Sequence, residues 1–384
     1  MARRNRTTNT EGEKEAVTTK QPPTNNTGPK AYTRTAAGTT RIRTCLSLVV
    51  LLTAVTFGIW RWPWLGISRS PGGIVDQSES LYDPAFEVAD LPGRGKGLIA
   101  IRDIQQGELL IKERPVLRIP QQINTSPTTY LSQILSTLPP SDTRFYNLSF
   151  VHLPPHLHHD PLQVALAIVQ TNAVSAGPDH VGVFPTMARL NHACAGAFNA
   201  VYSWREGEGV LVVHALKGIS KGQELLTTYT DSKRKRDDRR NYLLSQYAFN
   251  CTCAVCSLPP SESAASDQRL ETMASLYQQF ASWGTGAIDG REAADIARAI
   301  WNLGDEEGYW SERGRLAGDV VWVAAAHSDI SAMREWAELA VRWYGYELGR
   351  DSEQVREMEE VVSRPEKHRG WGTRTEMAIG DREI

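Results

Sequence analysis

The chain has 384 residues, enough for two or three domains that each bury a hydrophobic core. Its formal net charge of −2 excludes a globally basic nucleic-acid binder, and no sequence-specific nucleic-acid binding is expected. Five cysteines in a chain of this length exclude a disulfide-based scaffold.

The N-terminal 60 residues predict a tail and a membrane anchor. Residues 1–43 are polar and basic with few apolar side chains, so we expect a disordered basic tail. Residues 44–60, TCLSLVVLLTAVTFGIW, are uncharged and lie between arginines, and Trp62 and Trp64 follow. Their length is at the lower limit of the roughly 17–25 residues of a spanning helix, and tryptophan is typical of the membrane interface. We expect a retained single-pass anchor; an amphipathic or core segment, or a wrongly assigned gene start, is the alternative.

The body of the protein begins near Leu81, after a linker at 61–80 that is rich in proline, glycine and serine. Residues 85–117 contain short stretches of alternating apolar and polar or of β-branched residues, separated by turn residues, and these predict strands of a small sheet. Wider apolar spacing in 127–150 and 160–175 predicts helices inserted between strands. Residues 198–204 and 210–216 predict a β-hairpin, 224–230 another strand, and 232–247 a charged helix whose residues 233–240 face solvent.

After Pro259 and Pro260 the composition shifts to alanine, glutamate, arginine and tryptophan, and the apolar residues recur at helical spacing. The predicted helices are 264–283, 289–302, 315–327, 330–347 and 351–362. We therefore expect an α+β protein: a mostly-β core with a helical insert at 81–260, an all-α region at 261–364 and a flexible tail at 365–384. A monomer is expected.

Three of the five cysteines, Cys251, Cys253 and Cys256, fall within six residues. Structural zinc sites are almost always tetrahedral, with four ligands and zinc–sulfur distances of about 2.3 Å, so this C-x-C-x-x-C run lacks one ligand. Cys45 lies in the apolar stretch, which leaves Cys194 as the remaining thiolate. We expect these four cysteines to hold a structural zinc ion; two disulfides in an oxidising compartment are the alternative.

The side of the membrane is ambiguous in the sequence. More basic residues precede the apolar stretch than follow it, which by the positive-inside rule favours a lumenal body and glycans at Asn124, Asn147 and Asn250. Reduced thiolates instead favour the cytosol or nucleus. We give the cysteine chemistry more weight and expect the body on the cytosolic or nuclear side.

Four motifs occur in a fixed order: 94–98 (RGKGL), 191–194 (NHAC), 222–229 (GQELLTTY) and 249–256 (FNCTCAVC). Together they resemble a SET domain with its post-SET zinc cluster, over roughly residues 85–257. The closest resemblance is to the SET-and-MYND type found among fungal SET proteins, in which a helical insert splits the core and a helical C-terminal domain follows. No cysteine-rich MYND finger is present in the sequence. The resemblance implies a protein-lysine N-methyltransferase that uses S-adenosyl-L-methionine on a histone or non-histone protein with a target lysine.

The resemblance also implies a role for individual residues. The implied cofactor contacts are Arg94, Lys96, Gly97, Asn172, Asn191, His192 and Phe249. Tyr229 matches the catalytic tyrosine and Tyr247 the second tyrosine of the lysine channel. A phenol suits methyl transfer because it can orient an amine and direct its oxygen dipole at the methyl group. Taken singly, these residues also fit a glycine turn, a buried polar pair and half-buried core tyrosines.

One segment departs from the family pattern, which places Pro-Asn shortly after Asn-His-x-Cys. This chain continues from Cys194 with Ala195-Gly196-Ala197-Phe198-Asn199, two residues longer and without proline. The departure puts a role for Asn199 in doubt. It also motivates a second hypothesis, a catalytically silent SET module that serves as a membrane-tethered interaction scaffold.

Overall fold

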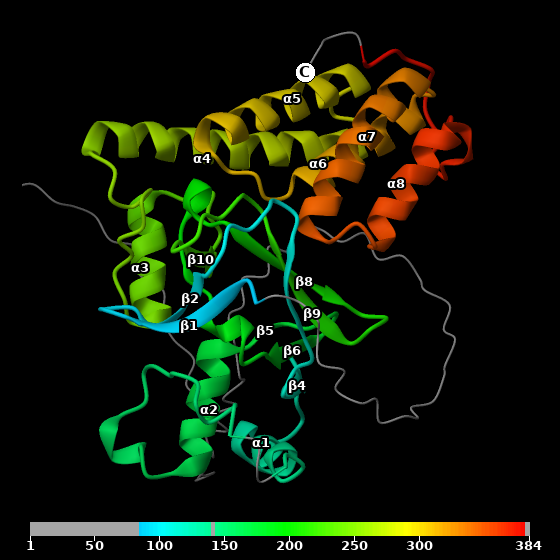
Figure 1. Cartoon of the computed structure of the whole chain (residues 1–384). Coiled ribbons are helices and arrows are strands. Elements are labelled where there is room, and N and C mark those ends of the chain that lie inside the picture. Colours follow the sequence, from blue (N-terminus) through cyan, green and yellow to red (C-terminus); the bar gives the residue numbers. More distant parts are fainter. Residues whose placement is uncertain (1–83, 140–142, 381–384) are drawn as a thin grey trace, which may run out of the picture. The chain divides into compact units, whose positions relative to one another are not determined.

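The structure is a computed structural model that describes residues 84–139 and 143–380, all within one compact unit of the chain (Figure 1). Its strands are β1 (Phe86–Leu91), β2 (Gly95–Ala100), β3 (Leu109–Glu113), β4 (Leu117–Pro120), β5 (Val174–Ser175), β6 (His180–Val183), β7 (Asn191–His192), β8 (Ala200–Arg205), β9 (Val210–Ala215) and β10 (Glu224–Thr227). Its α-helices are α1 (Pro127–Leu135), α2 (Pro161–Asn172), α3 (Arg236–Tyr247), α4 (Pro260–Ala281), α5 (Gly290–Glu307), α6 (Arg313–Ala326), α7 (Ile330–Glu347) and α8 (Glu353–Ser363). The predicted α+β class is confirmed.

The first sheet, in the order β1-β2-β10-β7, brings distant parts of the sequence together. β2 pairs antiparallel with β1 and with β10, and β10 pairs parallel with the two-residue strand β7. The β1–β2 turn contains Gly93 and Gly95 at φ values of 72° and 70°, a left-handed conformation that costs glycine little. The sheet therefore places the glycine turn, the Asn-His pair and the strand leading to Tyr229 beside one another.

The second sheet contains the predicted hairpin, which is confirmed as β8 and β9 and is extended by β3. Strand β9, VLVVHA, is buried along its whole length. Its Leu211 and Val213 pack in one core cluster with Leu98 of β2 and Leu225 of β10. β-branched side chains pack well on a pleated, buried surface, which explains why this run forms a central strand.

The insert between β4 and β6 contains α1 and α2 (Figure 1). Both begin with a capping side chain followed by proline: Ser126 accepts from the N–H of Thr129, and Asp160 accepts from that of Leu162. The helix predicted over 127–150 is wrong in length, because α1 ends at Leu135 and Pro139 cannot continue a helix. The helix predicted over 160–175 is confirmed as α2.

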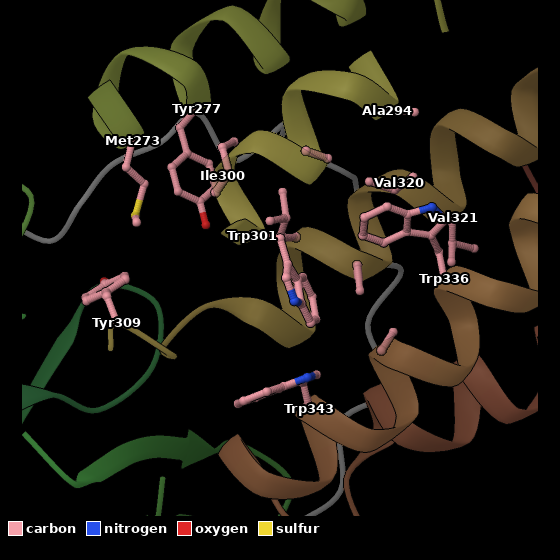
Figure 2. Close-up of a cluster of buried hydrophobic side chains, with 14 of the residues drawn as sticks. Met273, Tyr277, Ala294, Ile300, Trp301, Tyr309, Val320, Val321, Trp336 and Trp343 are labelled. Atoms are coloured by element: carbon pink, nitrogen blue, oxygen red, sulfur yellow. The ribbon is translucent and has the colours of Figure 1, made fainter. Parts of the chain in front are cut away.

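The five helices predicted after residue 261 are confirmed as α4 to α8, coloured yellow-green to red in Figure 1. Figure 2 shows part of their core, in which Trp301 contacts Trp336 and Trp343 edge to face at centroid distances of 6.1 and 5.9 Å. The guanidinium of Arg313 lies 4.6 Å from the Trp301 ring and 4.7 Å from the Trp343 ring. The apolar residues that recur at helical spacing in these segments thus form the buried face of each helix.

The prediction that residues 233–240 form a solvated face holds for the exposed Lys235, Asp237 and Asp238 but is wrong for two other residues of this stretch. Lys233 and Arg239 are 5% and 0% exposed. The Lys233 ammonium lies 2.9 Å from the Glu312 carboxylate and 5.2 Å from the Tyr309 ring. Burial alone would lower the pKa of Lys233, but Tyr309 and Glu312 raise it above its usual value. The physical reason for the error is that partners far along the chain compensate the buried charge.

The predicted flexible tail packs against the helices as far as the structure describes it. Ile379 is buried, and its N–H donates to Asp329 at 2.7 Å. The Arg298 guanidinium donates to the Ile379 carbonyl at 3.3 Å. The expectation for this stretch rested on its position at the end of the chain, which does not reveal such backbone contacts.

The predicted membrane anchor, and the localisation built on it, need correction. Among residues 84–139 and 143–380, no helix is long and apolar enough to cross a membrane. Residues 44–60, on which the prediction rested, lie outside the described residues, as do the predicted tail at 1–43 and the linker at 61–80. The single-pass anchor is therefore not supported.

Candidate active site and zinc cluster

Glu224, at the start of β10, holds together three of the four motifs. Its carboxylate lies 3.1 Å from the Arg94 guanidinium of the glycine turn and accepts from the Asn191 amide of β7 at 2.9 Å. Arg94 also donates to the carbonyl of His192 at 3.2 Å, and Asn191 donates to that of Lys96 at 3.3 Å. Charge-assisted hydrogen bonds of this kind fix the three segments in one arrangement.

Gly97 is required by the close approach of its neighbours. A Cβ atom at this position would lie 2.5 Å from Leu91 Cδ1, 2.9 Å from Asn191 Nδ2 and 3.0 Å from Glu224 Oε1. The predicted cofactor residue Gly97 thus acts by allowing Asn191 and Glu224 to meet above the strand. The Lys96 ammonium pairs with Asp90 on the exposed side of the hairpin, at 2.9 Å.

His192 links the cysteine cluster to Tyr229. The Tyr229 N–H donates to His192 Nδ1 at 2.9 Å, so that nitrogen carries no proton. In the neutral ring the proton is then on Nε2, which lies 3.1 Å from the Cys194 sulfur and donates to it. The imidazole is 3% exposed, and this pair of contacts fixes its orientation.

Three aromatic residues gather at the same place. The Tyr229 ring lies 5.0 Å from that of Tyr247 and 6.5 Å from that of Phe249, and 5.3 Å from the His192 ring. The Tyr229 hydroxyl donates to the Leu190 carbonyl at 2.6 Å. Burial, with a smaller contribution from Tyr247, raises the pKa of Tyr229 well above its usual value, so the phenol is neutral at pH 7.

The four predicted zinc ligands converge. One ligand atom from each of Cys194, Cys251, Cys253 and Cys256 lies within 4.8 Å of the others. The Cys194 sulfur is 4.0 Å from that of Cys251 and 3.6 Å from that of Cys256. Zinc–sulfur distances of about 2.3 Å in a tetrahedron give sulfur separations of about 3.8 Å. Convergence on one point does not fit two separate disulfides, and all four are free thiols.

Arg239, from α3, provides a test of whether these residues fit a metal. Its side chain is fully buried, and its Nε and Nη2 atoms have no hydrogen-bond partner among the described residues. Burial alone would lower the pKa of Arg239, but negative charge on Cys194 and Cys256 raises it. Four thiolates around Zn²⁺ carry a net charge of −2, which a buried guanidinium would partly neutralise. The residues therefore fit a four-cysteine zinc site.

Asn172 is the one predicted cofactor residue that the structure does not bring into this group. It ends α2, and its amide donates to the carbonyls of Ser149 and Ile168 at 2.7 and 2.8 Å. These contacts hold the insert together, and in the described part of the chain the Asn172 amide forms no hydrogen bond with the other predicted cofactor residues.

The sequence interpretation missed the importance of two residues. Glu224 was part of a motif but was given no role. Asn199 was doubted because of the longer turn after Cys194, yet its side chain donates to the Glu224 carbonyl at 2.9 Å and accepts from the Leu226 N–H at 2.8 Å. The Asn199 amide therefore satisfies one backbone acceptor and one backbone donor of β10, as a neighbouring strand would. The sequence does not show that Asn199 lies beside β10.

Comparisons with known proteins found a family match and several similar proteins. Residues 95–230 match the SET domain family. The histone-lysine N-methyltransferase set5 of Schizosaccharomyces pombe is 25% identical over 285 residues, which cover 74% of this chain and 85% of that protein. The human N-lysine methyltransferase SMYD2 is 30% identical, over 28% of this chain and 25% of that protein. A solved SET domain of LSMT, bound to lysine and AdoHcy, aligns with 76% of this chain and 84% of that chain, at 14% identity and a TM-score of 0.27.

The predicted resemblance is confirmed by the family match and by these relatives. The chain thus contains a SET domain at residues 95–230 and is similar to lysine methyltransferases, among them relatives of the SET-and-MYND type.

Proposed function

We propose that this protein is an S-adenosylmethionine-dependent protein-lysine N-methyltransferase, with Tyr229 as its catalytic residue. The observation that carries the proposal is the position of the Tyr229 phenol. It lies in ring contact with Tyr247 and Phe249. The Tyr229 N–H donates to His192, and the neighbouring Asn191 donates to the Glu224 carboxylate that pairs with Arg94.

The proposed chemistry follows from the direction of the Tyr229 hydroxyl. S-adenosylmethionine, when bound, supplies an electrophilic methyl group on a sulfonium. Tyr229 donates its proton to the Leu190 carbonyl, so its oxygen lone pairs remain available to accept weak C–H···O contacts and to orient a lysine amine. Aromatic surroundings from Tyr229 and Tyr247 lower a lysine's pKa by desolvation and favour its neutral, nucleophilic form.

The proposed cofactor contacts are the residues around the glycine turn and the aromatic group. A Cβ at Gly95 would meet no heavy atom within 4 Å, so the turn leaves open space beside Arg94. The faces of Phe249 and Tyr229 suit a sulfonium cation and an adenine ring. Lys96, Gly97, Asn191 and His192 complete the proposed set; Asn172 stays a prediction.

We further propose that a structural zinc ion is bound by the four cysteines and fixes the segment that carries Phe249 against His192. The substrate is proposed to be a lysine of a histone or non-histone protein. The division of the body into a catalytic part at 81–260 and a helical part at 261–364 is also kept as a proposal.

Calorimetric titration of the zinc-replete protein with S-adenosylmethionine tests the proposal. We expect one binding site per chain, and transfer of the methyl group to lysine side chains when core histones or a cell protein extract are added. Binding that is lost in Asn191→Ala, but kept in the matched control Asn241→Ala on α3, would support the assigned site. Absence of binding by the zinc-replete protein would refute the enzyme and leave the silent interaction scaffold.

A further inference from the structure

The turn that departs from the family pattern, Ala195–Ala197, packs against the end of α5. A Cβ atom at Gly196 would lie 2.1 Å from the carbonyl oxygen of Glu307, the last residue of α5, and 3.2 Å from the carbonyl carbon of Gly308. Because the obstacle is backbone on a different segment, only glycine fits at this position. The two extra residues thus form a specific contact with the helices that follow the SET domain.

Lys217, two residues after the end of β9, contacts both the turn and the end of α5. Its ammonium donates to the carbonyl of Gly196 at 2.5 Å and to that of Gly308 at 2.7 Å. It also lies 5.2 Å from the centre of the Trp310 ring. One cation therefore joins the turn after Cys194 to the C-terminal cap of α5, where Gly308 adopts a φ of 66°.

The turn is continuous with the proposed catalytic group. Ala197 donates through its N–H to the Cys194 carbonyl at 2.9 Å, and the Cys194 sulfur accepts from His192. His192 in turn accepts from the backbone of Tyr229. Ala195 has a φ of 41°, unfavourable for a residue with a Cβ, so the turn depends on its surroundings to keep this shape.

We propose that Lys217 and Gly196 are positioning residues, through which the end of α5 holds the turn after Cys194 and thereby sets the positions of Cys194, His192 and Tyr229. The helical region then has a direct part in the active site's geometry. The role of Tyr229 rests on the proposed function, but the contact itself can be tested without methyl transfer. Burial, assisted by the charge of Arg313, lowers the pKa of Lys217 to about 8, so the ammonium form still predominates at pH 7.

Two variants with matched controls test the proposal. Lys217→Met keeps the straight aliphatic chain and removes the donor, and Gly196→Ala adds the colliding Cβ. Gly284→Ala is the control, since a Cβ there meets no heavy atom within 4 Å. Lys221→Met, on an exposed loop, is the control for loss of a lysine.

The first readout is zinc release to a coloured chelator, and the second is hydrogen exchange of the Tyr229 amide. We expect both rates to rise about tenfold or more in Lys217→Met and Gly196→Ala, because a charged donor to two carbonyls contributes more than one ordinary hydrogen bond. Amide exchange in α7 should stay at the wild-type rate, as should both readouts in the two controls.

Wild-type zinc release together with wild-type Tyr229 exchange in Lys217→Met would overturn the proposal. Lys217→Met keeps the test decisive if Gly196→Ala does not fold. The exchange measurement also separates this proposal from the proposed function, because it requires neither bound S-adenosylmethionine nor a methylated product.

Discussion

Replacing Gly97 with alanine perturbs the arrangement around Glu224 at its tightest point. The new Cβ would stand 2.9 Å from Asn191 Nδ2 and 3.0 Å from Glu224 Oε1, both closer than van der Waals contact allows. The contact with Leu91 Cδ1, at 2.5 Å, is cheaper to relieve, because that atom is the end of a flexible side chain. The variant must therefore move the Asn191 amide, which loses its hydrogen bonds to Glu224 and to the Lys96 carbonyl.

The size of the effect follows from these contacts. Weakening one charge-assisted and one neutral hydrogen bond, together with overpacking, should lower the free energy of unfolding by about 1 to 3 kcal/mol. Because Asn191 belongs to the proposed cofactor site, affinity for S-adenosylmethionine should fall as well. The stability change is measured by urea denaturation and the affinity by calorimetry.

Gly207→Ala, in the β8–β9 turn, is the matched control, because a Cβ there meets no heavy atom within 4 Å. The control should change the free energy of unfolding and the affinity little. If Gly97→Ala matches Gly207→Ala in both measurements, the close approach of Asn191 and Glu224 is not needed and the reasoning fails.

Three further changes have expected outcomes. Cys256→Ser removes one of four ligands, so atomic absorption should show zinc falling from one ion per chain to a small fraction, with a lower melting temperature; full zinc retention would contradict the four-cysteine site. Lys233→Met removes the nearer of two cations that pair with the partly buried Glu312 carboxylate and leaves the Arg315 guanidinium at 3.5 Å, which should cost about 1 to 3 kcal/mol in urea denaturation, and Lys233→Met combined with Glu312→Gln should recover part of that loss. Burial, with the charge of Arg205, lowers the pKa of His214 from 6.5 to about 4. Between these values only the unfolded chain binds the proton, so stability should fall as pH falls from 6.5 towards 4, by roughly 3 kcal/mol more than in His214→Gln; parallel pH curves would contradict the shift.

Local patterns in the sequence predicted the parts of the fold that local physics determines. The β-branched run at 210–216 and the glycines before it specify the β8–β9 hairpin, and the apolar period of the last third specifies α4 to α8. The cysteine spacing likewise predicted that Cys194 would meet the C-x-C-x-x-C run, because a tetrahedral site demands a fourth ligand.

Local sequence patterns do not predict contacts between segments that are far apart in the chain. Lys233 looks like a surface lysine until Glu312, 79 residues further along, is placed beside it. Gly196 looks like part of a loose insertion until the end of α5 is seen to occupy the space of its missing Cβ. In both cases the residue type is explained by a partner whose approach depends on the whole fold.

The most direct test of the proposed function compares wild-type protein with Tyr229→Phe in single-turnover methyl transfer from labelled S-adenosylmethionine, with the modified side chain located by mass spectrometry. We expect the wild type to label lysine Nζ and the variant to be slower by roughly 100-fold or more, since removal of one preorganised polar group commonly has that effect. Affinity for S-adenosylmethionine should change little, and Tyr130→Phe, in the insert helix α1, should behave as wild type. Lysine methylation by Tyr229→Phe at the wild-type rate would contradict the role of Tyr229, and a zinc-replete wild type that labels no lysine would contradict the enzyme.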